Sequence, residues 1–100
     1  MQIIRNYVSR IELSNDDNQV FSLSMTPTDP AQLRGGQRYL KVTDGAEQST
    51  FFQLDGPLPH DVQELTEFYE DTFGRQMGFA GRVELVAFAE VQQPLTAVTL

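Results

Sequence analysis

The sequence predicts an α+β protein in which one helix packs on a mainly antiparallel sheet of five to six strands. Short segments of alternating apolar and polar residues, separated by turn residues, fill most of the first half of the chain. One later segment, residues 59–73, instead has the period of an amphipathic helix. Because 100 residues leave room for one domain, we treat residues 1–100 as a single domain.

The first two strands are expected within residues 2–13 and 19–26. Alternation is partial in the first segment and regular in the second, where Phe21, Leu23 and Met25 share one face. The segment between them, SNDDNQ, consists of residues that favour turns. We therefore predict two antiparallel strands joined by an acidic loop.

A loop of about ten residues and a second hairpin are expected next. The loop, TPTDPAQLRGG, has two prolines and two adjacent glycines, which oppose regular structure, and long ordered loops are often functional. The hairpin pairs residues 37–43 with 48–55 around Asp44-Gly45, a dipeptide typical of tight turns. We expect a four-residue loop, because it places Leu40 opposite Phe51 rather than Ser49.

The helix is expected over about 59–73, with Asp61 at its N-terminal cap and Gly74 after its end. Asp61 followed three residues later by Glu64 is typical of a capping box. A helical wheel gathers the apolar side chains into one buried stripe. The stripe consists of Val62, Leu65, Tyr69 and Phe73.

A last strong strand is expected at residues 81–91, followed by an ambiguous tail. Val83 and Leu85 lie on one face of this strand, and Val86 and Phe88 on the other. A strand that is apolar on both faces is central in its sheet or covered by another element. Residues 94–100 begin with a proline and continue as a β-prone run, which fits an edge strand or a mobile tail. The predicted order is β-β-β-β-α-β, with a seventh element if the tail pairs.

Charge limits the partners that the protein can bind. Fourteen acidic and seven basic residues give a net charge of −7, which repels nucleic acids and anionic membranes and attracts basic surfaces. We therefore expect no direct nucleic-acid partner and no membrane partner. The chain shows no apolar run of the length that spans a bilayer and no signal-peptide pattern, so a cytoplasmic protein is expected.

No residue pattern indicates an active site, a metal or a cofactor. The only histidine, His60, could meet Asp61 and Glu64, but zinc and iron sites usually have several nitrogen or sulfur ligands. The chain has no cysteine and no G-x-S-x-G motif. A cluster of three cations, Arg34, Arg38 and Lys41, could form a solvated face, pair with the acidic helix or bind phosphate. We expect no catalytic residue, no metal and no cofactor.

The outer face of the predicted helix is the strongest functional lead. Its acids occupy an arc about 120° wide on the wheel, and no Lys or Arg lies between them. Neighbouring carboxylates at this spacing repel one another by about 0.2 to 0.5 kcal/mol per pair, and the last turn of a helix disfavours anions. The aromatic Phe68 borders this arc. The predicted partner-binding residues are Glu64, Glu67, Phe68, Glu70 and Asp71.

These observations favour a small acidic protein–protein interaction module that binds a basic surface, such as one that normally holds nucleic acid. In size and charge the chain is similar to small acidic inhibitors such as phage anti-CRISPR proteins and toxin-immunity proteins, a similarity that involves no motif. An alternative is a self-assembling structural or accessory subunit that pairs through residues 81–91 and 94–100. A third is a small enzyme without a recognisable motif.

Overall fold

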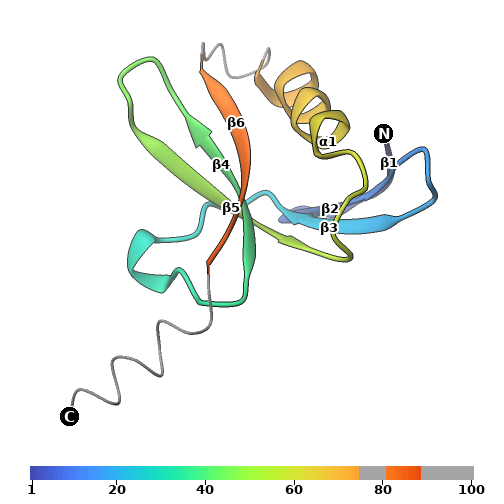
Figure 1. Cartoon of the computed structure of the whole chain (residues 1–100), viewed down its shortest axis with the longest axis horizontal. Helices are drawn as coiled ribbons and strands as arrows, with labels where there is room; N and C mark the ends of the chain where they lie inside the picture. The colour runs from blue at the N-terminus through green and yellow to red at the C-terminus, as the bar shows by residue number, and fades with distance from the viewer. Residues whose placement is uncertain (75–80, 89–100) are drawn as a thin grey trace.

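A computed structural model of the chain describes residues 1–74 and 81–88. It contains a six-stranded antiparallel sheet with one α-helix, α1, packed on it (Figure 1), which confirms the predicted fold class. The sheet order is β1-β2-β3-β5-β4-β6. The strands are β1 (Gln2–Asn6), β2 (Arg10–Ser14), β3 (Val20–Ser24), β4 (Arg38–Thr43), β5 (Ser49–Asp55) and β6 (Arg82–Ala87). The helical elements are η1 (Pro30–Gln32), α1 (Val62–Tyr69) and η2 (Glu70–Gly74).

The first predicted strand is in fact two strands. A tight turn separates β1 from β2, and its Tyr7 N–H donates to the carbonyl of Arg10 at 2.8 Å. The register of this pair shifts between Ile3 and Arg5, where one extra residue bulges out of the strand. The turn and the bulge explain why the alternation in residues 2–13 is only partial.

The sheet consists of two parts that meet at a short junction. β4 pairs with β5 and with β6 over six residue pairs each, whereas β3 joins β5 only through Ser22↔Asp55 and Leu23↔Leu54. In Figure 1 the strands β1–β3 run across the direction of β4–β6. One part is therefore the meander β1-β2-β3, and the other is the three-stranded unit β5-β4-β6.

The hairpin between β4 and β5 has a five-residue loop, residues 44–48, and not the predicted four-residue loop. Thr43 pairs with Ser49, so Leu40 faces Phe52 rather than Phe51. The residue with a left-handed backbone is Glu47, at φ 63°, and Asp44 closes the loop by accepting two backbone hydrogen bonds. The extra residue keeps two core residues, Leu40 and Phe52, on the same face.

The main core lies between the helix and one face of the sheet. Leu65 and Tyr69 of α1 are buried there, and the Tyr69 ring packs on Phe52 at a centroid distance of 5.8 Å. The predicted stripe is wrong at Val62, which is 38% exposed, because the buried face of the helix begins one turn later. The sheet contributes Ile11, Leu13, Phe21, Leu23, Leu40, Val42, Phe52, Leu54 and Val83 to this core.

A smaller aromatic cluster covers the other face of β4, β5 and β6. Tyr39, Phe51 and Phe88 pack with ring centroids 5.7 to 6.2 Å apart. The proline- and glycine-rich loop runs over this cluster and bonds to it: Thr28 N–H donates to Phe51 O at 2.8 Å, and Arg34 N–H to the Tyr39 hydroxyl at 3.1 Å. β6, an edge strand, is therefore partly covered on both faces: Val83 is buried, and Leu85 and Val86 are half-buried.

Some predictions fall outside the described residues. Of the predicted strand 81–91, the structure describes residues 81–88, with β6 spanning Arg82–Ala87. The tail 94–100 lies beyond them, so its strand remains a prediction. Within residues 1–74 and 81–88, no helix is both long enough and apolar enough to cross a membrane.

Candidate protein-binding surface

The helix begins at Val62, later than the predicted start near residue 59, and its N-terminal cap is the predicted one. Asp61 is its N-terminal cap and accepts hydrogen bonds from the N–H groups of Gln63, at 3.0 Å, and Glu64, at 3.3 Å. Leu65 and Tyr69 turn inward, so the polar face turns toward solvent. This orientation decides which of the predicted acids are accessible.

Three of the predicted acids are exposed. Glu67 lies on the outer face of α1, and Glu70 and Asp71 lie in η2. The sequence from 62 to 74 contains no Lys, Arg or His. Glu67 also accepts a hydrogen bond of 2.7 Å from the Gln63 side chain one turn earlier, which holds its carboxylate along the helix surface.

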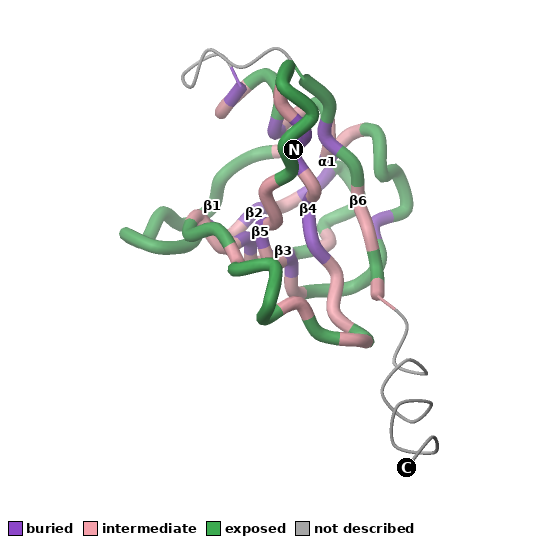
Figure 2. Tube along the Cα trace, turned by 90° about the vertical axis from the view of Figure 1, so that its left-hand side faces the viewer, coloured by how far each residue is buried: buried purple, intermediate pink, exposed green. Residues whose placement is uncertain are grey.

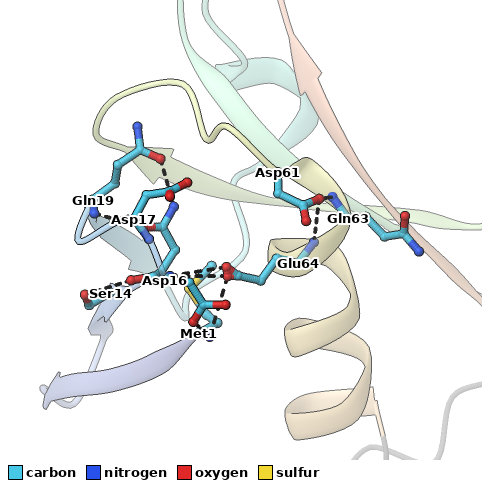
Figure 3. A network of polar contacts seen from close by, with 9 residues as sticks. Met1, Ser14, Asp16, Asp17, Gln19, Asp61, Gln63 and Glu64 are labelled. Carbon is cyan, nitrogen blue, oxygen red and sulfur yellow. Dashed lines mark hydrogen bonds and ion pairs between the residues drawn. The ribbon is translucent and has the colours of Figure 1, made fainter.

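Glu64 has a different role from the other acids. Its side chain is only 19% exposed, and both carboxylate oxygens lie 3.4 Å from the backbone N of Asp16 (Figure 3). It also forms an ion pair with the amino group of Met1 at 3.7 Å. Glu64 therefore ties the helix to the β2–β3 loop instead of facing a partner.

The β2–β3 loop, residues 15–19, is organised by one buried side chain. Asn15 is 7% exposed, and its Oδ1 accepts hydrogen bonds from the N–H groups of Asp17, at 3.1 Å, and Gln19, at 2.8 Å. Its Nδ2 donates to Gln19 Oε1 at 2.8 Å, and Asn18 takes the left-handed backbone at φ 61°. This arrangement leaves Asp16 and Asp17 exposed at the tip.

The same loop packs against the segment that leads into α1. Gln19 Nε2 donates to the carbonyl of Leu58 at 3.1 Å, and the His60 N–H donates to Gln19 Oε1 at 3.3 Å. The His60 ring lies 3.2 Å from the Asp17 carboxylate, and both side chains are exposed. Asp16 and Asp17, more than 40 residues before the helix acids in sequence, are thus held beside the beginning of the helix.

We call the exposed carboxylates of these two elements the acidic surface. It consists of Asp16, Asp17, Glu67, Glu70 and Asp71. Sequence reasoning missed the two loop acids, because SNDDN looks like an ordinary turn and its contact with the helix is long-range. Within the described chain, no Lys or Arg forms an ion pair with Glu67 or Glu70.

Phe68 lies at the edge of the core and is not a projecting side chain. It is half-buried, packs against the main core and meets Phe73 edge-on at a centroid distance of 6.4 Å. An interface anchor would be exposed in the free protein. Its role in binding stays a prediction. Because the ring is half-buried, it offers a partner less accessible area than the sequence indicates.

The end of the helix departs from regular α geometry. The residues after Tyr69 form a π-helical turn, η2, and the Glu70 N–H bonds to the carbonyls of Glu67 and Thr66. Such turns are rare and occur frequently at functional sites. The π turn begins at Glu70, which still has α-helical dihedral angles (φ −59°, ψ −46°), so the 100° step of the predicted wheel no longer applies from Asp71 onward.

Tyr69, the last residue of α1, carries a buried hydroxyl without a hydrogen-bond partner among the described residues. Its side chain is 1% exposed. Burial removes water from the hydroxyl and raises the pKa of Tyr69 to about 12, because the charged form cannot be solvated there. This unpaired group directly precedes the π turn that carries two acids of the acidic surface.

The three predicted cations do not form one cluster. Arg34 lies in the loop after β3, Arg38 donates to the Gly56 carbonyl at 2.8 Å, and Lys41 faces Glu84 across β4 and β6. None of them forms an ion pair with the acids of the helix in the part of the chain that the structure describes. Their joint role therefore stays unsupported.

Comparison with known proteins adds no further constraint. No protein-family model, no curated protein and no solved structure matches this chain. Among residues 1–74 and 81–88, no group of three or more His, Cys, Asp or Glu side chains is arranged to hold a metal ion.

Proposed function

We propose that the protein is a protein–protein interaction module whose acidic surface binds a basic partner. One observation carries this proposal: Glu67 and Glu70 are exposed on a helical segment that has no cation, and the β2–β3 loop adds Asp16 and Asp17 beside it. A helix selected only for stability would alternate these acids with Lys. A basic partner would instead relieve their mutual repulsion on binding.

The physical consequences of such a surface can be stated in advance. Exposed charges steer a partner of opposite charge and raise the association rate more than the affinity. Binding should weaken as salt increases, because a Debye length of about 8 Å at physiological ionic strength screens separated charges. An interaction that depends on shape alone would not respond in this way.

The proposal is tested by capture from the native source followed by binding measurements with charge-neutral variants. Glu67→Gln, Glu70→Gln and Asp71→Asn together should lower the affinity for the captured partner at least about tenfold, mainly through the association rate. A matched control changes Glu12→Gln, Glu47→Gln and Glu84→Gln, which removes the same number of charges elsewhere. Equal affinity for both triple variants would contradict the proposal.

A finer prediction is that the module inhibits a protein that binds nucleic acid. A phosphate backbone and a cluster of carboxylates both place several negative charges close together, so both can bind the same basic surface. The purified partner should then release a labelled oligonucleotide when this protein is added, and the triple variant of the acidic surface should fail to release it. If the partner binds the oligonucleotide and this protein at the same time, the protein is a binding module that does not compete with nucleic acid.

Self-association is a second candidate, and the first hairpin supplies a specific observation for it. β1 is an edge strand, and all five of its residues are exposed (Figure 2). Ile3, Ile4, Tyr7 and Val8 are exposed apolar residues of this hairpin, and Val8 is fully exposed. An uncovered strand edge with apolar side chains favours pairing with another chain.

Sedimentation velocity over a wide concentration range tests this second candidate. Ile4→Lys with Val8→Lys should dissociate an oligomer that forms through β1, whereas removal of residues 94–100 should dissociate one that forms through the predicted tail strand. A monomer at every concentration excludes both. The acidic-surface variants should leave the oligomeric state unchanged, which separates this candidate from the first.

A further inference from the structure

A polar groove lies on the face of the sheet opposite the main core. It consists of two adjoining cavities of about 330 and 380 Å³ that share Ser24, Thr26 and Gln53. Ser24 and Gln53 alternate with the core residues of their strands, so their side chains turn to the opposite face. Neither the acidic surface nor the β1 edge includes residues of this groove.

The loop that forms one wall of the groove is held in place by its own hydrogen bonds. Asp29 caps the short helix η1 by accepting from the Ala31 N–H at 2.9 Å. Thr28 bonds to the backbone of Phe51, and Arg34 N–H bonds to the buried hydroxyl of Tyr39. A wall fixed at several points can bind a ligand without the entropic cost of ordering a loop.

Several polar groups that line the groove have no side-chain partner in the described part of the chain. They comprise the hydroxyls of Ser9, Thr26 and Thr28, the amide of Gln32 and the guanidinium of Arg34. Gln53 Nε2 donates to both carboxylate oxygens of Asp55, at 3.3 and 3.2 Å, which fixes the amide and leaves its Oε1 as an acceptor. Donors and acceptors that converge in a preformed hollow are typical of a site for a polar ligand.

The charge of the groove differs from that of the whole protein. Its only acid, Asp55, is engaged by Arg10 at 3.5 Å and by the amide of Gln37 at 3.2 Å. Arg34 has no carboxylate partner, so Arg10, Arg34 and Asp55 leave the groove with one positive charge in excess. A chain with net charge −7 repels polyanions at a distance. A small ligand with one anionic group meets less of this repulsion than a polyanion and gains the contact with Arg34.

We propose that this groove binds a small, hydroxyl-rich anion, namely a sugar that carries one carboxylate or phosphate group. The Arg34 guanidinium takes the anionic group through paired N–H donors. The hydroxyls of Thr26 and Thr28 and the two glutamine amides bond to the sugar hydroxyls. Both cavities are open to solvent, so a bound ligand stays partly hydrated and the expected affinity is weak, in about the millimolar range.

An NMR titration of the backbone amides tests this site with three defined probes: glucuronate, glucose 6-phosphate and glucose. One or both anionic sugars should shift the amides of Ser24, Thr26, Thr28 and Arg34 in a saturable way, and glucose should bind at least about tenfold more weakly. The two anions distinguish a carboxylate from a phosphate. No saturable shift at these amides with either anion, or equal affinity for glucose, would overturn the proposal.

Two variants complete the test. Arg34→Gln should lower the affinity for the anionic sugar at least about tenfold, because the charged contact is lost. Arg82→Gln removes an equal charge from β6, at a position outside the groove, and should leave the affinity unchanged. Equal losses in the two variants would show a nonspecific effect of charge and would exclude the site. Since Arg34 is exposed, its replacement should not unfold the protein.

Discussion

Two hairpin loops of this protein, residues 15–19 and 44–48, have the same conformation and different surroundings. Each begins with a residue whose side-chain Oδ1 accepts from the backbone N–H groups two and four positions later. Each has its left-handed residue in the fourth position, Asn18 at φ 61° and Glu47 at φ 63°. The local sequence therefore specifies the same turn twice.

The two loops differ in what covers them. The loop 15–19 packs against the start of α1 through Gln19, Asp16 and Asp17, and its Asn15 is buried. The loop 44–48 projects into solvent, and an exposed ion pair joins its Glu47 to Arg82 at 4.0 Å. Local hydrogen bonds therefore determine the conformation of each loop. Contact with an element distant in sequence, here the start of α1, determines whether the loop belongs to the acidic surface.

The largest expected difference between the loops follows from removing the first side chain of each. Asn15→Ala removes a buried side chain and leaves two partly buried N–H groups without their acceptor, so it should cost about 2 to 3 kcal/mol of unfolding free energy. Asp44→Ala should cost only about 0.5 to 1 kcal/mol, because water reaches the exposed loop. Urea unfolding followed by circular dichroism measures both, since the chain has no tryptophan. Equal costs would show that the helix contact does not stabilise the first loop.

Tyr69 extends the comparison to a buried polar group that, unlike Asn15, has no hydrogen-bond partner among the described residues. Its pKa is raised from 10.0 to about 12 in the folded protein, so the fold favours the neutral hydroxyl. The resulting stability is complete below pH 10 and is lost as the pH rises toward 12, by up to about 2 to 3 kcal/mol. Tyr69→Phe should lack this loss and should be neutral or slightly stabilising at pH 7.

Thermal unfolding between pH 7 and pH 11 distinguishes the contribution of Tyr69 from that of other groups. The wild-type protein and the Tyr69→Phe variant share every other titrating residue, so the difference between their curves isolates this hydroxyl. A Tyr39→Phe variant serves as a control, because the Tyr39 hydroxyl already accepts from the Arg34 N–H. Parallel curves for wild type and Tyr69→Phe would contradict the raised pKa.

An intermediate effect is expected where an acid joins the helix to the first loop. Glu64→Gln weakens the contacts with the Asp16 N–H and the amino group of Met1 and should cost about 1 kcal/mol. Glu47→Gln in the second loop should cost almost nothing, because exposed ion pairs contribute little. Urea unfolding measures the two losses. A larger loss for Glu47→Gln would reverse the difference between the loops.

The smallest expected effects concern the left-handed residues. Glu47→Gly should stabilise the protein by about 0.5 kcal/mol, because glycine adopts a positive φ without steric cost. Asn18→Gly should change the stability by less than about 0.3 kcal/mol, because asparagine tolerates this conformation and glycine loses more entropy on folding. Unfolding midpoints of the two variants give the comparison. Equal gains would show that Asn18 is as strained as Glu47.

Sequence reasoning identified the elements that depend on neighbouring residues. The alternation in β3, the cap at Asp61 and the exposed side of the helix at Glu67 all follow from local pattern. The length of the loop 44–48 was missed by one residue. Phe51 and Phe52 are both apolar, so either could face Leu40, and the pattern of the strands did not fix the loop length. Asp44 closes the longer turn by accepting a hydrogen bond from the Gln48 N–H.

Long-range contacts were beyond the reach of the pattern. Glu64 was explained by a capping box with Asp61 and also counted among the partner-binding acids, yet its carboxylate lies against the backbone N of Asp16, in a loop 48 residues earlier. The two apolar faces of β6 indicated a strand that is central or covered; β6 lies at the edge of the sheet with partial cover on both faces. Nothing local indicated that the loop after β3 lies over the second face. Of the acidic surface, the sequence therefore predicted the helical acids Glu67, Glu70 and Asp71 and missed the loop acids Asp16 and Asp17.

The short junction between β3 and β5 has a consequence for how the molecule opens. Two residue pairs join the meander β1-β2-β3 to β5-β4-β6, and Gly56 lies so close to β3 that a Cβ there would come within 2.9 Å of the Val20 carbonyl oxygen. Hydrogen exchange of the backbone amides should resolve two cooperative units that separate along this seam, with the meander opening at lower free energy. In that case the loop that presents Asp16 and Asp17 would belong to the unit that opens first.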